Sequence, residues 1–409
     1  MKLKPALALL VLPLAISSAY AEDGDGMPTF TFSGFGSETL TKSNTDDAEF
    51  ARPNQLKGVT THAKNGVDSN FGFQATAKFN DWLSFTGQGL VSKIVTDEFS
   101  GHLSLGFAKA KISDNLFIRV GRVGLPLYFI SDSREIGYAN TMIRPVVEVY
   151  GQAQVGSIDG VDVVYQTSIG DTSLSAQFVA GQIDVPNKSG FTVNFTKTVS
   201  TNLTVENGPF SARLGYSQAN VNVSDYAAIN GLVANLRKFG FTTVADNMDI
   251  IDKKGSFISL GGTLDWKNIV VQTEFGKRKV DSLAFPNTSS WYTMVGYRMG
   301  KFLPYFNHAS AKQDTPRTVA GLPTSGPFLG LTLGANSVAG SAPLQTSNSV
   351  GLRWDFYKSA AFKMQLDRFS PENGAGTFTK AKPGFTGPVN VSAAGVLDQH
   401  NAGLQRVGR

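Results

Sequence analysis

Hydrophobic and polar residues alternate along many short stretches of this chain, and residues 70–79 show the pattern in its simplest form. One set of alternate positions holds Phe71, Phe73, Ala75, Ala77 and Phe79, and the other holds Gly72, Gln74, Thr76 and Lys78. Because successive side chains of a β-strand point to opposite faces, the pattern predicts a strand with one apolar and one polar face. Asn80-Asp81 follow directly, as is typical of a tight turn between antiparallel strands.

Sixteen such stretches are predicted as strands. They cover residues 30–40, 70–79, 82–92, 102–112, 115–123, 161–167, 172–181, 199–206, 209–221, 256–266, 269–280, 290–299, 302–312, 347–357, 360–369 and 387–395. The connections alternate between short pairs, such as Asn207-Gly208, and long segments, the longest being 124–160, 222–255 and 313–346. A barrel with short turns at one end and long loops at the other produces this rhythm. The predicted fold is therefore all-β, a 16-stranded antiparallel transmembrane up-and-down β-barrel.

The N-terminus has the features of an export signal. Lys2 and Lys4 precede an apolar stretch at 6–14, and Ala19-Tyr20-Ala21 resembles a cleavage site. The apolar stretch is too short to span a membrane, so we expect a signal peptide over 1–21 and a single barrel domain over 22–409. The absence of cysteine means that an exported chain must be stabilised by something other than disulfides, such as a closed sheet. The net charge of +5 is too small to indicate a nucleic-acid partner.

Two alternatives remain beside the barrel. A soluble β-sandwich or a two-domain secreted protein would also show alternation, although neither requires such regular long and short connections.

Within the connection 222–255, Ile229, Leu232, Val233 and Leu236 recur at helical spacing and Gly240 follows, so a short helix is predicted there.

Motifs for catalysis are missing from the sequence. His62, His102, His308 and His400 are scattered without metal-ligand spacing, and neither a nucleophile elbow nor a phosphate-binding loop is present. We therefore expect a protein that is not an enzyme and that has no cofactor and no metal site.

The third long connection differs from the others. The stretch GRVGLPLYFISDSREIGYANTMIRPVVEVYGQ, residues 121–152, combines charges of both signs with many aromatic, aliphatic and proline residues. A loop that needed only to be solvated would not require so many large apolar groups. We therefore expect this loop to fold inward, with its apolar residues on the inner wall and its carboxylates facing water.

The chain resembles the Gram-negative outer-membrane general porins of the sixteen-stranded, trimer-forming class. The residues that carry the resemblance are Gly121-Arg122, Pro126, Ser131-Asp132, Gly137-Tyr138, Arg144-Pro145, Glu148, Tyr150 and Asp159-Gly160. The resemblance implies a homotrimer in the outer membrane of a Gram-negative bacterium, in contact with outer-membrane lipid. It also implies a water-filled channel for passive diffusion of ions and small hydrophilic solutes, narrowed by the third loop.

The resemblance further implies a constriction with acidic groups on the loop and a basic cluster on the opposite wall. The acidic candidates are Asp132, Glu135 and Glu148. Alternation nominates as inward-facing bases Lys78, Arg119, Arg213, Arg353 and Lys363, and Arg122 is added because it directly precedes the loop. An Arg or Lys facing lipid near the bilayer midplane would cost roughly 2–4 kcal/mol, which favours the inward assignment for the set.

Two questions stay open at this point. The channel could be a general diffusion pore or a selective one, for an organic acid or a sugar, and a secreted soluble β-protein is a third possibility. The C-terminus departs from the porin pattern, because Asp398, His400 and Asn401 interrupt alternation and no terminal aromatic closes the chain at Arg409. The tail after Val391 therefore puts normal membrane insertion in question.

Overall fold

A computed structural model describes residues 28–342, 344–372, 376–385 and 387–401. The signal peptide predicted over 1–21 and the residues that follow Asn401 lie outside this described part of the chain.

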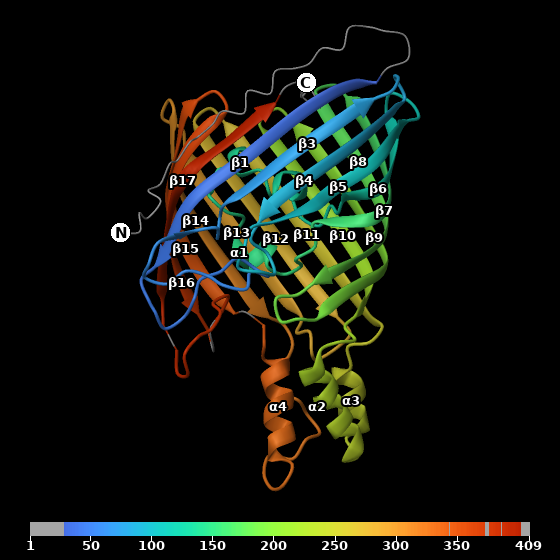
Figure 1. Cartoon of the computed structure of the whole chain (residues 1–409), viewed down its shortest axis with the longest axis vertical. Coiled ribbons are helices and arrows are strands. Elements are labelled where there is room, and N and C mark those ends of the chain that lie inside the picture. Colours follow the sequence, from blue (N-terminus) through green and yellow to red (C-terminus); the bar gives the residue numbers. More distant parts are fainter. Residues whose placement is uncertain (1–27, 343, 373–375, 386, 402–409) are drawn as a thin grey trace, which may run out of the picture.

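A closed antiparallel sheet forms the body of the protein (Figure 1). The barrel strands in the described residues are β1 Thr29–Ser43, β3 Asn70–Lys78, β4 Leu83–Ser92, β5 Ser100–Lys111, β6 Leu116–Gly124, β7 Ser157–Ile169, β8 Thr172–Pro186, β9 Thr192–Asn207, β10 Phe210–Asn222, β11 Lys253–Trp266, β12 Ile269–Val280, β13 Thr288–Tyr297, β14 Phe302–Gln313, β15 Gln345–Tyr357, β16 Ala360–Pro371 and β17 Val389–Asn401. Each pairs with its neighbour in sequence, and β1 also pairs with β17, which closes the ring. The sixteen predicted strands and the barrel are confirmed.

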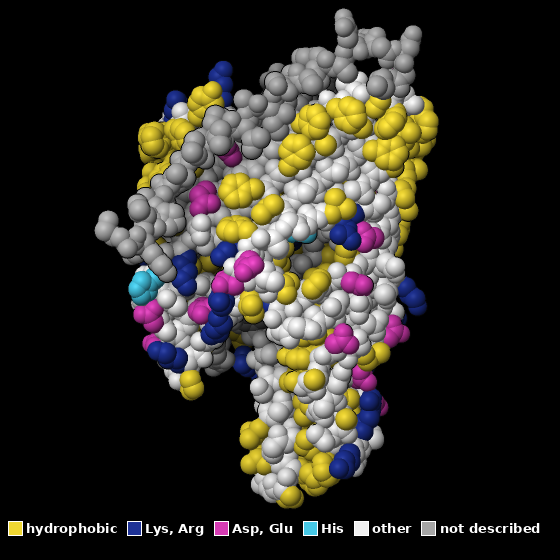
Figure 2. Space-filling model, viewed as in Figure 1, with side chains coloured by type: hydrophobic (Ala, Val, Ile, Leu, Met, Phe, Trp, Pro, Cys, Tyr) yellow, Lys and Arg dark blue, Asp and Glu magenta, His cyan; other side chains and the backbone are white. Residues whose placement is uncertain are grey.

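The two faces of each strand differ as the alternation predicts. On β3, Phe71 and Phe73 face the outside of the barrel and are 46% and 47% exposed, whereas Asn70 on the same strand faces inward and is buried. Trp82, Trp266 and Trp354 are exposed near short turns, and Figure 2 shows hydrophobic side chains gathered towards the end of the barrel where those turns lie. An outer surface of this kind is suited to contact with acyl chains, and closure of the sheet leaves no unpaired strand edge.

The long loops lie at the opposite end and carry the helices (Figure 1). Helices α2 Ala227–Lys238 and α3 Thr242–Met248 follow β10, and α4 Leu329–Ala339 follows β14. They pack around a small core that includes Ile229, Val233 and Leu236, so the helix predicted in this loop is confirmed, whereas α4 was not predicted. No helix among the described residues has the length and apolarity needed to cross a membrane.

In strand β5 the residues that face inward and those that face outward exchange places part-way along. Between β4 and β5 the pairing shifts, so that Gln88 lies opposite Leu105 while Gly89 lies opposite Leu103. Ser104 is the extra residue of this bulge, and every later side chain of β5 is moved to the other face. As a result Lys109 lies opposite Ser84, on the inward-facing side of β4.

The last strand is longer than predicted. The regular strand expected to end at residue 395 instead continues to Asn401, and it pairs with β1 on one side and with β16 on the other. Alternation also persists, with Val391, Ala393 and Leu397 buried inside. The strand end predicted at residue 395 is therefore wrong, because β1 and β16 satisfy the backbone on both sides whatever the side chains are. The predicted break in the apolar pattern is not contradicted, since Asp398 lies opposite Gly36 on the outward-facing side of β1.

Candidate functional site in the barrel lumen

The segment between β6 and β7, residues 125–156, lies against inward-facing side chains of strands far from its own. It contains two short 3-10 turns, η1 Ser131–Ser133 and η2 Gly137–Ala139, and one helical turn, α1 Val147–Tyr150. Its contacts include β12, β15 and β16, and Tyr138 Oη donates to the carbonyl of Lys358 in the short turn between β15 and β16 (3.0 Å). We refer to this segment as the third loop.

Two wall cations hold the backbone of the third loop. Arg353 Nη1 donates to the carbonyl oxygens of Tyr138 and Asn140 at 2.8 and 2.9 Å. Lys363 Nζ donates to the carbonyls of Gly137 (2.8 Å), Met142 (3.1 Å) and Asn140, and its side chain is completely buried. Both cations were predicted to face inward, but these contacts place them behind the third loop rather than at open water.

Gly137 allows the third loop to approach the wall this closely. A Cβ at this position would lie 2.3 Å from Ser37 Oγ on β1 and 2.5 Å from a methyl carbon of Leu397 on β17. A larger residue at position 137 would therefore have to displace the side chains of Ser37 and Leu397, which glycine does not.

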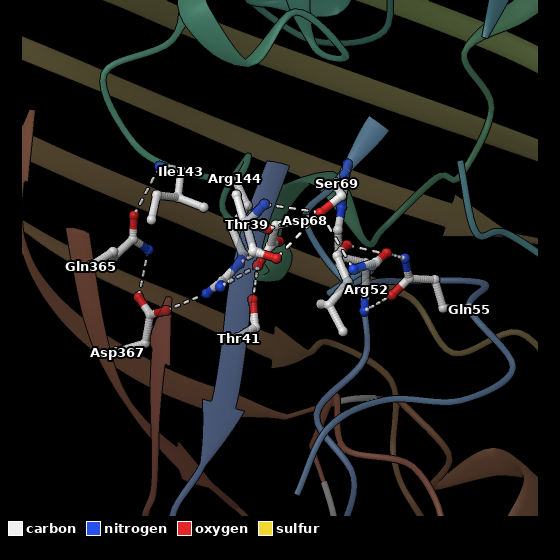
Figure 3. Close-up of polar contacts among 12 residues, drawn as sticks. Thr39, Thr41, Arg52, Gln55, Asp68, Ser69, Ile143, Arg144, Gln365 and Asp367 are labelled. Atoms are coloured by element: carbon white, nitrogen blue, oxygen red, sulfur yellow. Dashed lines mark hydrogen bonds and ion pairs between the residues drawn. The ribbon is translucent and has the colours of Figure 1, made fainter. Parts of the chain in front are cut away.

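A buried ion cluster fixes the middle of the third loop (Figure 3). Arg144 donates to both oxygens of Asp68, Nε to Oδ1 at 2.8 Å and Nη2 to Oδ2 at 2.5 Å, and Nη1 donates to Asp367 Oδ2. Thr41 Oγ1 donates to Asp68 at 2.9 Å, and Gln365 Nε2 donates to Asp367 at 2.7 Å. Burial opposes the charge of Asp68, but Arg144 outweighs it and the pKa of Asp68 is lowered from its ordinary value.

The first loop, residues 44–69, extends across the loop end of the barrel. Asn54 Nδ2 donates to the carbonyl of Pro186 (2.8 Å), and Asn54 Oδ1 accepts from the backbone N–H of Lys188 (3.0 Å). These partners lie in β8 and in the loop between β8 and β9, several strands away from β1 and β3 around the barrel. Arg52 Nη2 lies 3.7 Å from Glu135 Oε2, so the first and third loops are also joined by charge.

Polar side chains of β6 to β10 form a belt on the inner wall, in which Arg119 is partly exposed and Asp162, Gln177 and Asn202 are buried. Arg119 pairs with Asp162, Gln177 Nε2 donates to Asp162 Oδ2 (3.1 Å), and Asn202 Nδ2 donates to Gln177 Oε1 (2.9 Å). Further along, Arg213 Nη1 lies 3.4 Å from Asp132 Oδ2 on the third loop. Strand alternation brings these groups together, because each occupies an inward position of its strand.

Lys109 adds a cation to this belt, and the sequence analysis missed it. Lys109 lies opposite Arg119 in the β5–β6 ladder, and its Nζ lies 4.1 Å from the ring centroid of Phe117. Simple alternation from the start of β5 would have placed Lys109 outside, and the bulge at Ser104 reverses that. No short sequence motif marks the bulge.

The acidic candidates occupy three different environments. The Asp132 side chain is 69% exposed, and Glu135 lies between Arg52 and Arg134. Burial acts against the charge of Glu135, but the two arginines outweigh it and lower the pKa of Glu135 from its ordinary value. Glu148 is only 2% exposed and accepts a hydrogen bond from Gln345 Nε2 (2.7 Å). Asp132 is therefore the acidic candidate with the most access to water.

Two basic candidates lie away from the belt. Lys78 occupies an inward position at the turn end of β3 and pairs with Asp81 (2.8 Å). Arg122 lies opposite outward-facing Asp159, with Nε and Nη2 both 2.7 Å from carboxylate oxygens, and the ladder places this pair on the outer face of the barrel. Arg122 thus does not face the lumen, in contrast to its nomination from sequence.

Glu148 provides a first test of these placements. Burial raises the pKa of Glu148 above its ordinary value, so its ionised form destabilises the fold. The protonated carboxyl of Glu148 contributes stability below its pKa in the unfolded state. This contribution is lost as pH rises through its pKa in the folded state. We expect Glu148→Gln to keep the bond to Gln345 and to gain stability relative to wild type between pH 5 and pH 8, within roughly 1 kcal/mol, the net worth of one hydrogen bond.

Urea unfolding of the lipid-reconstituted protein at both pH values measures this change, and bilayer recording of the reversal potential accompanies it. The reversal potential should equal that of wild type. A reversal potential shifted from the wild-type value would contradict the burial of Glu148 against Gln345.

Similarity to solved structures agrees with this architecture. The chain is similar to Salmonella typhi OmpF, solved in complex with daunomycin (TM-score 0.57, 13% identity, 92% of this chain and 99% of that chain). It is also similar to the trimer form of OmpT, an outer membrane protein of Vibrio cholerae (TM-score 0.54, 14% identity, 91% and 100%). A third similar structure is the outer membrane channel DcaP of Acinetobacter baumannii (TM-score 0.52, 10% identity, 92% and 99%).

No family model and no curated protein matches the sequence. At these identities the structural likeness shows the fold alone. The fold is that of the Gram-negative outer-membrane porin barrel of the sixteen-stranded type, as the sequence resemblance predicts.

Proposed function

We propose that this protein is an outer-membrane porin, a water-filled channel through which ions and small hydrophilic solutes diffuse passively. The polar belt on β6 to β10 is the observation that carries the proposal. Arg119, Asp162, Gln177 and Asn202 form a hydrogen-bonded chain on the inner wall, where a protein with a solid interior would place apolar side chains. The proposal includes no catalytic step.

The mechanism is electrostatic and steric. The third loop contacts β1, β3, β10 and the strands from β12 to β17, so the path for solutes lies between this loop and β4 to β9. Along that path Asp132 presents a carboxylate from the loop, and Lys109 and Arg119 present cations from the wall. Opposed charges in a narrow aqueous passage orient dipolar solutes, and the balance of charge selects between ions.

We propose the same location and assembly as for the similar structures, namely a homotrimer in the outer membrane with lipid around it. One similar protein, Vibrio cholerae OmpT, was solved in a trimer form. The outward pair Arg122–Asp159 supports contact with something other than acyl chains on that part of the wall.

Planar-bilayer recording of the purified protein tests both statements. We expect stepwise ohmic currents in KCl, and closure of each inserted unit at high voltage in three equal steps. Protein that fractionates without detergent and gives no current steps would refute the channel. Closure in a single step would refute the trimer while leaving the channel in place.

A further inference from the structure

A second feature of the lumen is a cavity that is mainly apolar. It has a volume of about 210 Å³ and lies between the base of the third loop and the inner faces of β8 to β12. Its walls include Leu125, Leu127 and Val155 from the third loop and Val185, Phe195 and Val221 from the strands. The cavity is large compared with the roughly 30 Å³ that a water molecule occupies in the liquid.

Two polar groups of the cavity wall have unused hydrogen-bonding capacity. Thr198 is 5% exposed and its Oγ1 has no hydrogen-bond partner among the described residues. Arg278 donates through Nη1 to the carbonyl of Gln152 (2.8 Å) and through Nη2 to that of Pro286 (2.9 Å), but its buried Nε has no partner in the same set. Buried donors without partners are unfavourable unless a ligand or water satisfies them.

The charge of the cavity wall has one sign. Its charged side chain is Arg278, because Lys279 occupies an outward-facing position of β12, and the described residues that line the cavity include no Asp or Glu. Arg278 is on the inward-facing side of β12, two positions after Gly276 and four after Glu274. The positive charge therefore attracts an anion, and the apolar part of the cavity wall favours a ligand that also has an apolar group.

We propose that this cavity binds a small amphipathic organic anion, a monocarboxylate with an aromatic or branched aliphatic body. The body occupies the apolar walls, and the carboxylate faces the guanidinium of Arg278 and accepts from the Thr198 hydroxyl. Burying the body drives binding, and the cation with the hydroxyl fixes the orientation. This inference rests on the proposed function, since it names a class of solute that pauses in the same lumen.

Block of the single-channel current by phenylacetate, compared with acetate and 2-phenylethanol, tests the site. We expect saturable block by phenylacetate at a concentration about tenfold below that needed for acetate, which corresponds to roughly 1.4 kcal/mol. 2-Phenylethanol, which has the ring without the charge, should block less than phenylacetate. Equal midpoints for phenylacetate and acetate would overturn the proposal.

Two substitutions test the geometry. Ala219→Leu places three extra carbons in the cavity and should raise the phenylacetate midpoint about tenfold with unchanged KCl conductance. Thr198→Val keeps the side-chain shape without the hydroxyl and should raise the midpoint severalfold. The matched control is Ala108→Leu, the same change on the outer face of β5, which should behave as wild type. A midpoint in Ala219→Leu equal to that of wild type would refute the site.

Failure of the channel itself remains distinguishable. If the protein gives no KCl current, the proposed function is wrong, and calorimetric titration of detergent-solubilised protein with phenylacetate still decides the cavity. Heat of binding in wild type that is lost in Ala219→Leu supports the site, and equal heats in both proteins overturn it.

Discussion

Replacing Arg144 by alanine is expected to lower the free energy of unfolding by about 3–5 kcal/mol, the cost of removing one partner from a buried ion pair. Arg144 is 3% exposed, and the variant leaves Asp68 and Asp367 buried without their cation. The same cluster joins the first loop, the third loop and β16, so its loss also releases the middle of the third loop (Figure 3). We therefore expect a noisier and larger single-channel current in addition to the loss of stability.

The control is Arg237→Ala, which removes an arginine that also pairs with two aspartates. Arg237 lies between Asp246 and Asp249 at the surface, and its side chain is 47% exposed. Exposed ion pairs contribute little to stability, so the free energy of unfolding of this variant should equal that of wild type. Urea unfolding of lipid-reconstituted protein compares the two, and equal stability of both variants would contradict a structural role for the buried cluster.

The pH dependence gives a second readout of the same cluster. The folded-state pKa of Asp68 is lowered, so its ion pair contributes stability that is present above the unfolded pKa, about 3.9, and is lost as pH falls through the folded value. Without Arg144 the buried carboxyl takes up a proton more readily, which relieves the cost of burying its charge. The difference in stability between wild type and Arg144→Ala should therefore shrink as pH falls from 7 towards 4.

The strands could be predicted because their signal is local. In a barrel that has lipid outside and water inside, each strand alternates along its own length, and short turns such as Asn207-Gly208 mark where strands end. Pairing partners then follow from sequence order. Several strands extend further than predicted, β9 most of all, and the last strand continues because its backbone pairs with β1 and β16 whatever its own side chains are.

The site was predicted less completely because alternation gives a face and nothing more. Alternation indicated correctly that Arg353 and Lys363 face the interior. It could not show that both side chains donate to backbone carbonyls of the third loop. It could not show that Glu148 is buried against Gln345. Arg122 was nominated by its proximity to the loop in sequence, whereas the ladder places it outside opposite Asp159.

The reversal of Lys109 to glutamate is expected to change the ratio of cation to anion permeability about fivefold in favour of cations at 0.1 M KCl. A unit charge acting across about 4 Å of water is worth about 1 kcal/mol, and 1.4 kcal/mol is a factor of ten. Lys109 is suited to this test because no carboxylate of the described chain pairs with it, so its removal leaves no buried charge behind. Reversal potentials in a KCl gradient measure the change.

The control for this variant is Lys42→Glu, the same reversal at an exposed outward position on β1, which should leave the reversal potential unchanged. Asp132→Asn should shift the ratio the other way, towards anions, because it removes the exposed carboxylate of the third loop. Both shifts should weaken at 1 M KCl, where the screening length falls from about 10 Å to about 3 Å. Equal reversal potentials for Lys109→Glu and Lys42→Glu would mean that solutes do not pass the β5–β6 wall, and the path between that wall and the third loop would have to be abandoned.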